Sequence, residues 1–201
     1  MALRSSLRRE CSDQYAPGFI GVLAPAHLTL KEKQMLVQLS PREMSQCKQA
    51  AAMRWQLARA SGVVNQRKDK SRSDADLDLL GVKAEVAVSK VFNIPHQHAI
   101  GVDDGCDLWL DDISVDVKAT FHKSGRLLFK RKESFKADCA VLVCQIEPNK
   151  LNVVGYASQT TFMNKAQEID LGHGKGWAMM QDELNSLERL WYAARQSGLK
   201  F

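Results

Sequence analysis

Polar and apolar positions repeat with helical spacing between residues 40 and 62. Ser40 stands just before Pro41, and Glu43 follows Ser40 by three residues, which is the pattern of an N-terminal capping box. Apolar side chains then recur about one helical turn apart, at Met44, Cys47, Ala51, Trp55 and Ala58. The pattern predicts a helix with a basic polar side that ends at Gly62.

A second helical pattern covers residues 76–95, DLDLLGVKAEVAVSKVFNIP. Its predicted buried stripe consists of Leu77, Leu80, Ala84, Ala87, Val88 and Val91. Gly81 and Glu85 are four residues apart and therefore share a face. A glycine inside a helix costs about 1 kcal/mol relative to alanine, so it needs a reason. Two reasons for Gly81 stay open: it leaves room beside the Glu85 carboxylate, or it allows a close backbone contact.

Residues 105–120, GCDLWLDDISVDVKAT, alternate with the period of two that is typical of strands and predict a β-hairpin. Apolar residues at 113, 115, 117 and 119 occupy one face of the second strand, and Ser114, Asp116 and Lys118 occupy the other. With Asp111 and Asp112 in the turn, the predicted pairs are Leu110–Ile113, Trp109–Ser114, Leu108–Val115 and Asp107–Asp116. This register aligns the apolar faces of both strands, and a one-residue slip would separate them.

The remaining patterns are shorter. Residues 138–146 are continuously apolar and predict a central strand, and residues 151–158 predict a second strand after a turn at 149–150. Further predictions are a strand at 126–131, a helix at 159–166, a glycine-rich turn at 172–177, a C-terminal amphipathic helix from 181, and a loop with short extended pieces over residues 1–30. Together these elements predict a mixed α/β fold around one sheet.

Charge is distributed unevenly along the 201 residues, whose net charge is +5 and whose pI is about 9.0. Residues 42–72 and 122–136 are basic, and the segment between them is acidic. An acidic centre between basic stretches suits a metal site beside a polyanion, and charged solvated surfaces are the alternative reading. The five cysteines form no C-x-x-C pair, and we find neither a signal peptide nor an apolar run that could span a membrane. These features predict a cytoplasmic protein in a reducing compartment.

The hairpin carries the candidate chemistry. In the predicted register the Cβ atoms of Asp107 and Asp116 are about 5 Å apart, so their carboxylates repel. A divalent cation between them would offset the repulsion, and Lys118, about 6.6 Å further along the same face, could reach a bound water or a phosphate. Three alternatives stay open: a wet strand face, a turn capped by Asp107, and neutralisation of the pair by Lys118 without metal.

Glu85 on a helix, then Asp107, then D-V-K at residues 116–118, resembles the PD-(D/E)XK nuclease superfamily. The likeness covers residues 76–165. Cys106 stands where the family pattern has Pro, and Asp116 takes the place of the more frequent Glu. The resemblance implies a restriction-endonuclease-like core, in which helices flank a central mixed β-sheet, and Mg²⁺- or Mn²⁺-dependent hydrolysis of phosphodiester bonds in DNA.

The resemblance also implies roles for individual residues. Asp107, Asp116 and the backbone carbonyl of Val117 would bind the metal, and Glu85 would bind it directly or through water. Lys118 would position the attacking water. We expect DNA contacts, without sequence readout, from Lys123, Arg126, Lys130, Arg131, Lys132, Arg54, Arg67 and Lys68. Cutting both strands of a duplex would favour a homodimer or sequential nicking, and a small nuclease suits a phage or a mobile element.

On this reading residues 1–72 form a basic helical extension, residues 73–165 the nuclease core, and residues 166–201 a loop and helix that pack on it. A non-catalytic nucleic-acid-binding module of the same fold, acting inside a larger assembly, is the alternative function, and a structural protein with an accidental hairpin is a third. Weaker site candidates are His122, Gln145 and Gln159. We expect His96 and His98 to be surface residues, and Trp55, Trp177 and Trp191 to belong to the core.

Overall fold

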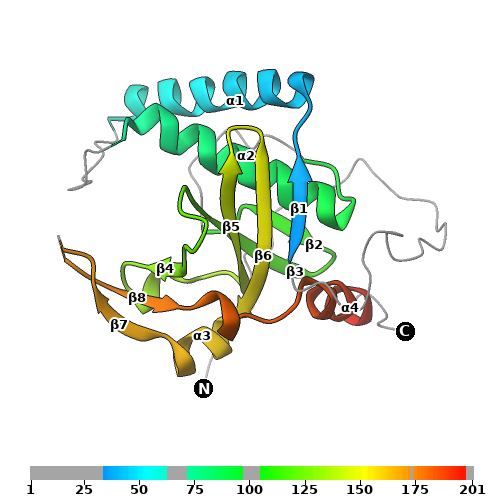
Figure 1. Ribbon diagram of the computed structural model, residues 1–201, viewed down its shortest axis with the longest axis vertical. Helices are drawn as coiled ribbons and strands as arrows, with labels where there is room; N and C mark the ends of the chain where they lie inside the picture. Colours follow the sequence, from blue (N-terminus) through cyan, green and yellow to red (C-terminus); the bar gives the residue numbers. More distant parts are fainter. Residues whose placement is uncertain (1–33, 63–71, 97–104, 173, 198–201) are drawn as a thin grey trace, which may run out of the picture.

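The computed structural model describes residues 34–62, 72–96, 105–172 and 174–197 (Figure 1). These residues form an α/β fold around a mixed five-stranded sheet with the order β1-β6-β5-β3-β2. Its strands are β1 (Met35–Gln38), β2 (Leu108–Leu110), β3 (Ile113–Thr120), β5 (Cys139–Glu147) and β6 (Lys150–Ser158). β3 and β5 run parallel, whereas the other neighbours are antiparallel. The continuously apolar segment 138–146 is therefore confirmed as a central strand.

The long helices α1 (Pro41–Ala60) and α2 (Asp74–Phe92) confirm both helical predictions. The Ser40 hydroxyl accepts a hydrogen bond from the Glu43 N–H, and the Glu43 carboxylate accepts one from the Ser40 N–H, which completes the predicted capping box. α2 begins two residues earlier than predicted because Ser73 caps it through the Asp76 N–H. It ends at Asn93, whose left-handed conformation closes the helix.

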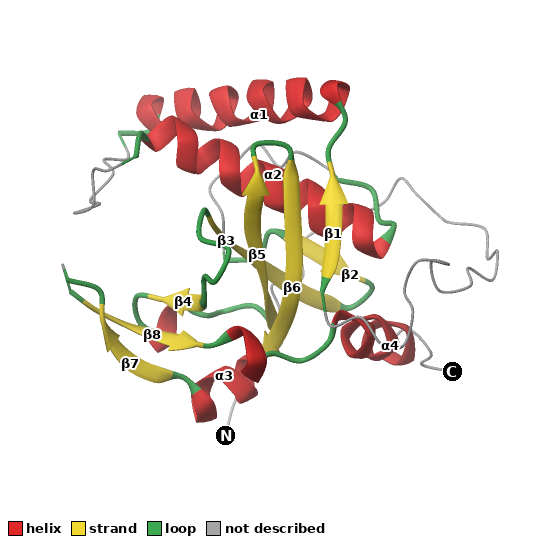
Figure 2. Ribbon diagram, viewed as in Figure 1, coloured by secondary structure: helices red, strands yellow, loops and turns green. Residues whose placement is uncertain are grey.

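α2 is buried almost all round between residues 80 and 92, not along one stripe as predicted. The sheet covers one side of the helix, and α1 covers the other (Figures 1 and 2). A Cβ added at Gly81 would have no atom within 4 Å, so the close backbone contact considered from the sequence is wrong. Even Lys83 is buried, and its ammonium donates hydrogen bonds to Gln145 Oε1 and to the Pro148 carbonyl, the latter at 3.0 Å. Burial lowers the pKa of this lysine.

A second, three-stranded sheet with the order β4-β8-β7 packs on the opposite face of the central sheet. It contains β4 (Leu127–Phe129), β7 (Gln167–Asp170) and β8 (Lys175–Met179), and helix α3 (Gln159–Lys165) lies beside it (Figure 2). Phe129, Phe135 and Phe162 form an aromatic cluster in the core between the two sheets. The structure confirms the predictions for β4 and α3, whereas β7 and β8 were not predicted.

The C-terminal helix α4 (Leu187–Ser197) begins six residues later than the predicted start at 181. Residues Gln181–Glu183 form a 3₁₀ turn, and Asn185 exchanges backbone hydrogen bonds with Tyr156 of β6. This bridge ties the segment to the sheet and delays the helix. α4 then buries Leu187, Leu190 and Ala194 in the core on the α2 side.

Residues 34–62 contact the rest of the described fold. β1, which was not predicted, pairs with β6, and α1 buries Cys47, Ala50 and Ala51 against α2. In the described ranges no helix is both long and apolar enough to cross a membrane. The predictions for residues 1–30 and for His98 lie outside the described residues.

Candidate active site

The predicted hairpin register is confirmed over its three pairs, Leu108–Val115, Trp109–Ser114 and Leu110–Ile113. Asp111 adopts a positive φ of 51° in the turn, a conformation that aspartate tolerates better than most residues. Val115 and Val117 point into the core that α2 covers. Strand alternation therefore places Ser114, Asp116 and Lys118 on the opposite face, toward the second sheet.

Asp107 lies at a bulge where the β2–β3 ladder ends. Its N–H donates a hydrogen bond to the Val115 carbonyl at 2.9 Å, and Val115 also pairs with Leu108. Two residues, Asp107 and Leu108, are therefore opposite Val115, and the predicted Asp107–Asp116 pair is wrong. The Asp107 carboxylate instead accepts a 2.6 Å hydrogen bond from the Val117 N–H. Since the N–H and C=O of a strand residue point to the same side, the Val117 carbonyl faces this edge as well. Asp107 thus meets the D-V-K segment in the plane of the sheet, beyond the end of β2.

Asp116 is buried, with 3% of its surface exposed, and it forms an ion pair with Lys118. The distance from Lys118 Nζ to Asp116 Oδ1 is 2.7 Å, and the side chain of Lys118 is 37% exposed. The same ammonium lies 4.9 Å from the centre of the Phe129 ring. This ion pair is the contact expected if Lys118 neutralises the Asp116 carboxylate without a metal. It also holds the partly exposed Lys118 ammonium beside Asp116.

Glu85, which the resemblance implies as a metal ligand, is contacted by two basic side chains. Its carboxylate receives two hydrogen bonds from the Arg54 guanidinium, at 2.5 and 2.6 Å, and lies 3.3 Å from His96 Nε2. Burial raises the pKa of Glu85, but the hydrogen bonds from His96 and Arg54 outweigh it, so the net shift is downward. Arg54, which we expected at DNA, is held by this carboxylate. His96 is 9% exposed at its side chain, so the expectation of a surface histidine is wrong.

A divalent cation at this hairpin would rely on few protein ligands. Among the described residues, no three side chains of His, Cys, Asp and Glu come together in a way that could hold a metal. Asp107, Asp116 and the Val117 carbonyl remain as candidate donors. Mg²⁺ commonly uses one or two carboxylates and keeps several waters, so this set suits Mg²⁺ better than a metal that needs a full protein cage.

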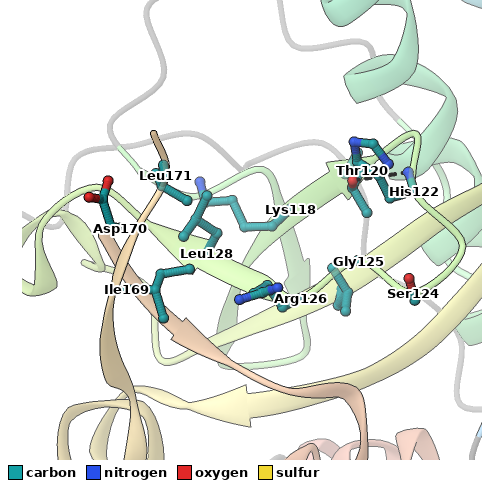
Figure 3. A pocket seen from close by; sticks show the side chains of 12 residues that line it. Lys118, Thr120, His122, Ser124, Gly125, Arg126, Leu128, Ile169, Asp170 and Leu171 are labelled. Atoms are coloured by element: carbon teal, nitrogen blue, oxygen red, sulfur yellow. Dashed lines mark hydrogen bonds between the residues drawn. The ribbon is translucent and has the colours of Figure 1, made fainter. Parts of the chain in front are cut away.

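A polar cleft opens over Asp116. We call it the Asp116 cleft: it has a volume of about 450 Å³ and is lined by Gly105, Asp116, Lys118, Arg131, Glu133, Ser134 and Lys136. Lys118 also lines a second hollow of about 540 Å³, the Arg126 pocket, which includes Thr120, His122 and Arg126 (Figure 3). Lys118 lines both hollows, and we call the two hollows together the basic groove: Arg131 and Lys136 line its Asp116 side, and Arg126 lines the other.

The expected DNA-contact residues fall into distinct groups. Arg126 and Arg131 line the two hollows, and Lys123 and Lys130 are exposed nearby. Lys132 is tied down, since its ammonium donates to the Met163 carbonyl at 2.7 Å and lies 4.1 Å from the centre of the Trp177 ring. Arg67 and Lys68 lie outside the described residues.

Lys136 lines the Asp116 cleft but was not among the expected contacts. Its place in the basic segment 122–136 was the available signal. Of the weaker candidates, His122 lines the Arg126 pocket. Gln145 accepts a hydrogen bond from Lys83, and Gln159 donates one to the Phe135 carbonyl at 2.6 Å. Both glutamines therefore have structural partners.

Two tryptophans are exposed. Trp55, expected in the core, is 41% exposed on α1, and Arg59 lies 5.4 Å from its ring centre. Trp109 is 61% exposed, and its pairing with Ser114 places it on the same sheet face as Asp116. Strand alternation alone was enough to assign Trp109 to this face, although not to show its exposure.

Comparison of the chain with protein-family models, with curated proteins and with solved structures gives no match. The chemistry proposed for the site therefore depends on its own residues and on the resemblance of their order to a nuclease motif.

Proposed function

We propose that this protein is a metal-dependent DNA nuclease of the PD-(D/E)XK type with a restriction-endonuclease-like core. One observation carries the proposal. Asp116 and Lys118 project from one face of a central-sheet strand into a basic groove, and the Asp107 carboxylate meets the backbone of Val117 between them. The order of α2, the β2–β3 hairpin and the parallel strand β5 supports the likeness.

In this proposal Asp107, Asp116 and the Val117 carbonyl hold Mg²⁺ or Mn²⁺. The bound cation would supply an activated water and neutralise phosphate oxygens. The bulge at Asp107 contributes to this arrangement, because it orients the carboxylate toward the edge that the Val117 carbonyl also faces. The short Asp107–Val117 hydrogen bond fixes that orientation.

Lys118 has the position of a water-orienting and charge-stabilising group. Its ammonium is held 2.7 Å from Asp116, yet more than a third of the side chain is exposed between two hollows. A lysine ammonium has three donors, so it can keep Asp116 and still donate to a water or a phosphate oxygen. Arg126, Arg131 and Lys136 then provide positive charge for the phosphate backbone on either side.

A non-catalytic nucleic-acid-binding module of the same fold is the second candidate. The pairing of Glu85 with Arg54 and His96 favours it, because the carboxylate implied as a further metal ligand is engaged elsewhere. The basic groove would serve binding equally well in this case. A cytoplasmic location, DNA binding without sequence readout and assembly as a homodimer are also part of the proposal.

The deciding experiment offers linear, circular, single-stranded and branched DNA to the purified protein with Mg²⁺, Mn²⁺ or EDTA. We expect metal-dependent cutting that Asp116→Asn and Lys118→Ala abolish. Asp112→Asn in the hairpin turn and Lys165→Ala at the end of α3 are matched controls, since both residues are exposed and line neither hollow. Binding without cutting in either metal would establish the non-catalytic module. Cutting that survives both site substitutions would rule out this site.

A further inference from the structure

The Arg126 pocket differs in chemistry from the Asp116 cleft that it adjoins. Its sides come from the end of β3, the following loop over residues 121–126, β4 and the end of β7. In Figure 3 Lys118, Leu128 and Leu171 lie at one end of the pocket and Thr120 and His122 at the other, with Arg126 between them. The pocket therefore begins at the residue that we place beside the scissile phosphate.

One side of the pocket is apolar. Leu128, Ile169 and Leu171 all line it, and each is only partly buried. The buried Gly176 leaves room for two of these side chains, since a Cβ there would lie 3.2 Å from a methyl group of both Leu128 and Leu171. A flat apolar ligand could cover this surface without displacing any backbone.

The opposite side is polar and mainly basic. Arg126, His122 and Ser124 are exposed, and Thr120 accepts a hydrogen bond from the His122 N–H at 3.2 Å. Asp170 places one carboxylate at the apolar end. A single hollow thus offers apolar side chains for a flat ring, basic donors for a phosphate and an acceptor for an amino group.

We propose that the Arg126 pocket binds one unpaired nucleotide of the strand that is cut, with its base on the Leu128–Ile169–Leu171 surface and its phosphate at Arg126 and His122. The inference rests on the proposed nuclease function, because Lys118 links the pocket to the Asp116 cleft. A base can enter such a pocket only when it is neither stacked nor paired. The preferred substrate class is therefore single-stranded DNA or an unpaired end or flap, rather than an intact duplex.

The test measures binding in EDTA, so that it does not depend on cutting. A fluorescent single-stranded 12-mer, the corresponding duplex, 2′-deoxyadenosine 5′-monophosphate and inorganic phosphate are titrated against the whole protein. We expect the single strand to bind at least tenfold more tightly than the duplex. The nucleotide should bind more tightly than inorganic phosphate, because only the nucleotide carries a base for the apolar surface.

Two substitutions locate the binding. Leu171→Trp fills the apolar end, and Arg126→Gln removes the phosphate donor; each should reduce single-strand affinity about tenfold and abolish the preference over duplex. Leu36→Trp on the far edge strand and Lys165→Gln at the end of α3 are the controls, since both residues are exposed and lie outside the pocket. Because Arg126 is an exposed side chain, its variant tests the pocket even where Leu171→Trp fails to fold.

The outcomes separate this inference from the function on which it rests. Single-strand and duplex binding of equal strength, or a preference that both substitutions leave unchanged, would overturn the inference even where metal-dependent cutting is observed. A single-strand preference that both substitutions remove, without cutting in any metal, would uphold the pocket and refute the nuclease. Binding of inorganic phosphate as tight as that of the nucleotide would reduce the pocket to an anion site and overturn the inference.

Discussion

Two buried carboxylates, one on each side of the central sheet, form similar ion pairs that differ in how far the partner cation is exposed to solvent. Glu85 on the α2 side has 6% of its side chain exposed, and its partner Arg54 has 28%. Asp116 on the other side has 4% exposed, and its partner Lys118 has 37%. The two acids are equally buried. Their cations differ: the Arg54 guanidinium donates to both oxygens of Glu85, whereas the Lys118 ammonium lies 2.7 Å from one oxygen of Asp116, Oδ1.

The surroundings of the two pairs suit them to different roles. The pair at Glu85 joins α1 to α2, and His96 covers it from the chain that follows α2. The pair at Asp116 opens on a cleft with further charged side chains. A buried pair that crosses two helices suits a structural role, and a buried acid at the wall of a cleft suits chemistry.

The largest effect expected from this comparison is on catalysis. Lys118→Met should lower the rate of DNA cutting at least about 100-fold, because it removes a donor aimed at developing negative charge. Single-turnover cutting of a labelled single strand measures the effect. Lys165→Met, an exposed lysine at the end of α3 that lines neither hollow, should leave the rate within about threefold of the original. A full rate in the Lys118 variant would place the chemistry elsewhere.

The next largest effect is on stability at the other pair. Arg54→Met should lower the free energy of unfolding by about 3 kcal/mol, because it leaves the Glu85 carboxylate buried without its fork. Urea denaturation gives the value. The matched control is Arg59→Met, whose partner Asp74 accepts at 3.3 Å on the surface, and its cost should stay below about 1 kcal/mol.

The Arg54–Glu85 pair should also respond to acid. The pKa of Glu85 in the folded protein lies below the ordinary value of 4.5, despite burial, because His96 and Arg54 hydrogen-bond to the carboxylate. Its contribution to stability is therefore complete above about pH 4.5 and is lost as the pH falls through the lower folded-state pKa. Glu85→Gln should remove this part of the acid dependence. An unchanged pH profile in that variant would contradict the assignment.

A smaller effect is expected for Trp109, the exposed indole on the Asp116 face. Trp109→Ala should weaken single-strand binding by about 1–3 kcal/mol, because an exposed ring on the sheet face of Asp116 can stack on a base. The free energy of unfolding should change by less than about 0.5 kcal/mol, since 61% of the residue is exposed. Trp55→Ala, an exposed tryptophan on α1, should leave binding unchanged in the same titration.

The smallest effect concerns Glu43, a third paired carboxylate, at the start of α1. Burial raises its pKa, but hydrogen bonds from Lys90 and Ser40 bring the value down to about 2. Glu43→Gln should cost about 1 kcal/mol at pH 7, and the difference should vanish as the pH falls from 4.5 toward 2. Thermal melts from pH 2 to 7 test this. Gln46→Glu, an exposed position on the same helix, is a charge control that should lack this dependence.

Local rules predicted the elements whose signals lie within a few residues. Ser40, Pro41 and Glu43 specify the start of α1, and alternation from Leu108 to Ala119 specifies the hairpin register, because capping and pleating depend on neighbours along the chain. The strands β1, β7 and β8 were missed, since four- or five-residue strands carry little periodic signal and depend on partners far away in the chain.

In the candidate site, too, some features follow from the sequence and others depend on contacts between elements. The amino-acid sequence by itself determined that Asp116 and Lys118 share a strand face with Trp109, because side chains on a strand alternate. Only the tertiary structure decided that Asp107 turns its carboxylate to Val117 at a bulge, that Glu85 pairs with Arg54, and that Lys118 separates two hollows. Those contacts join residues from different elements, and packing, not spacing along the chain, brings them together.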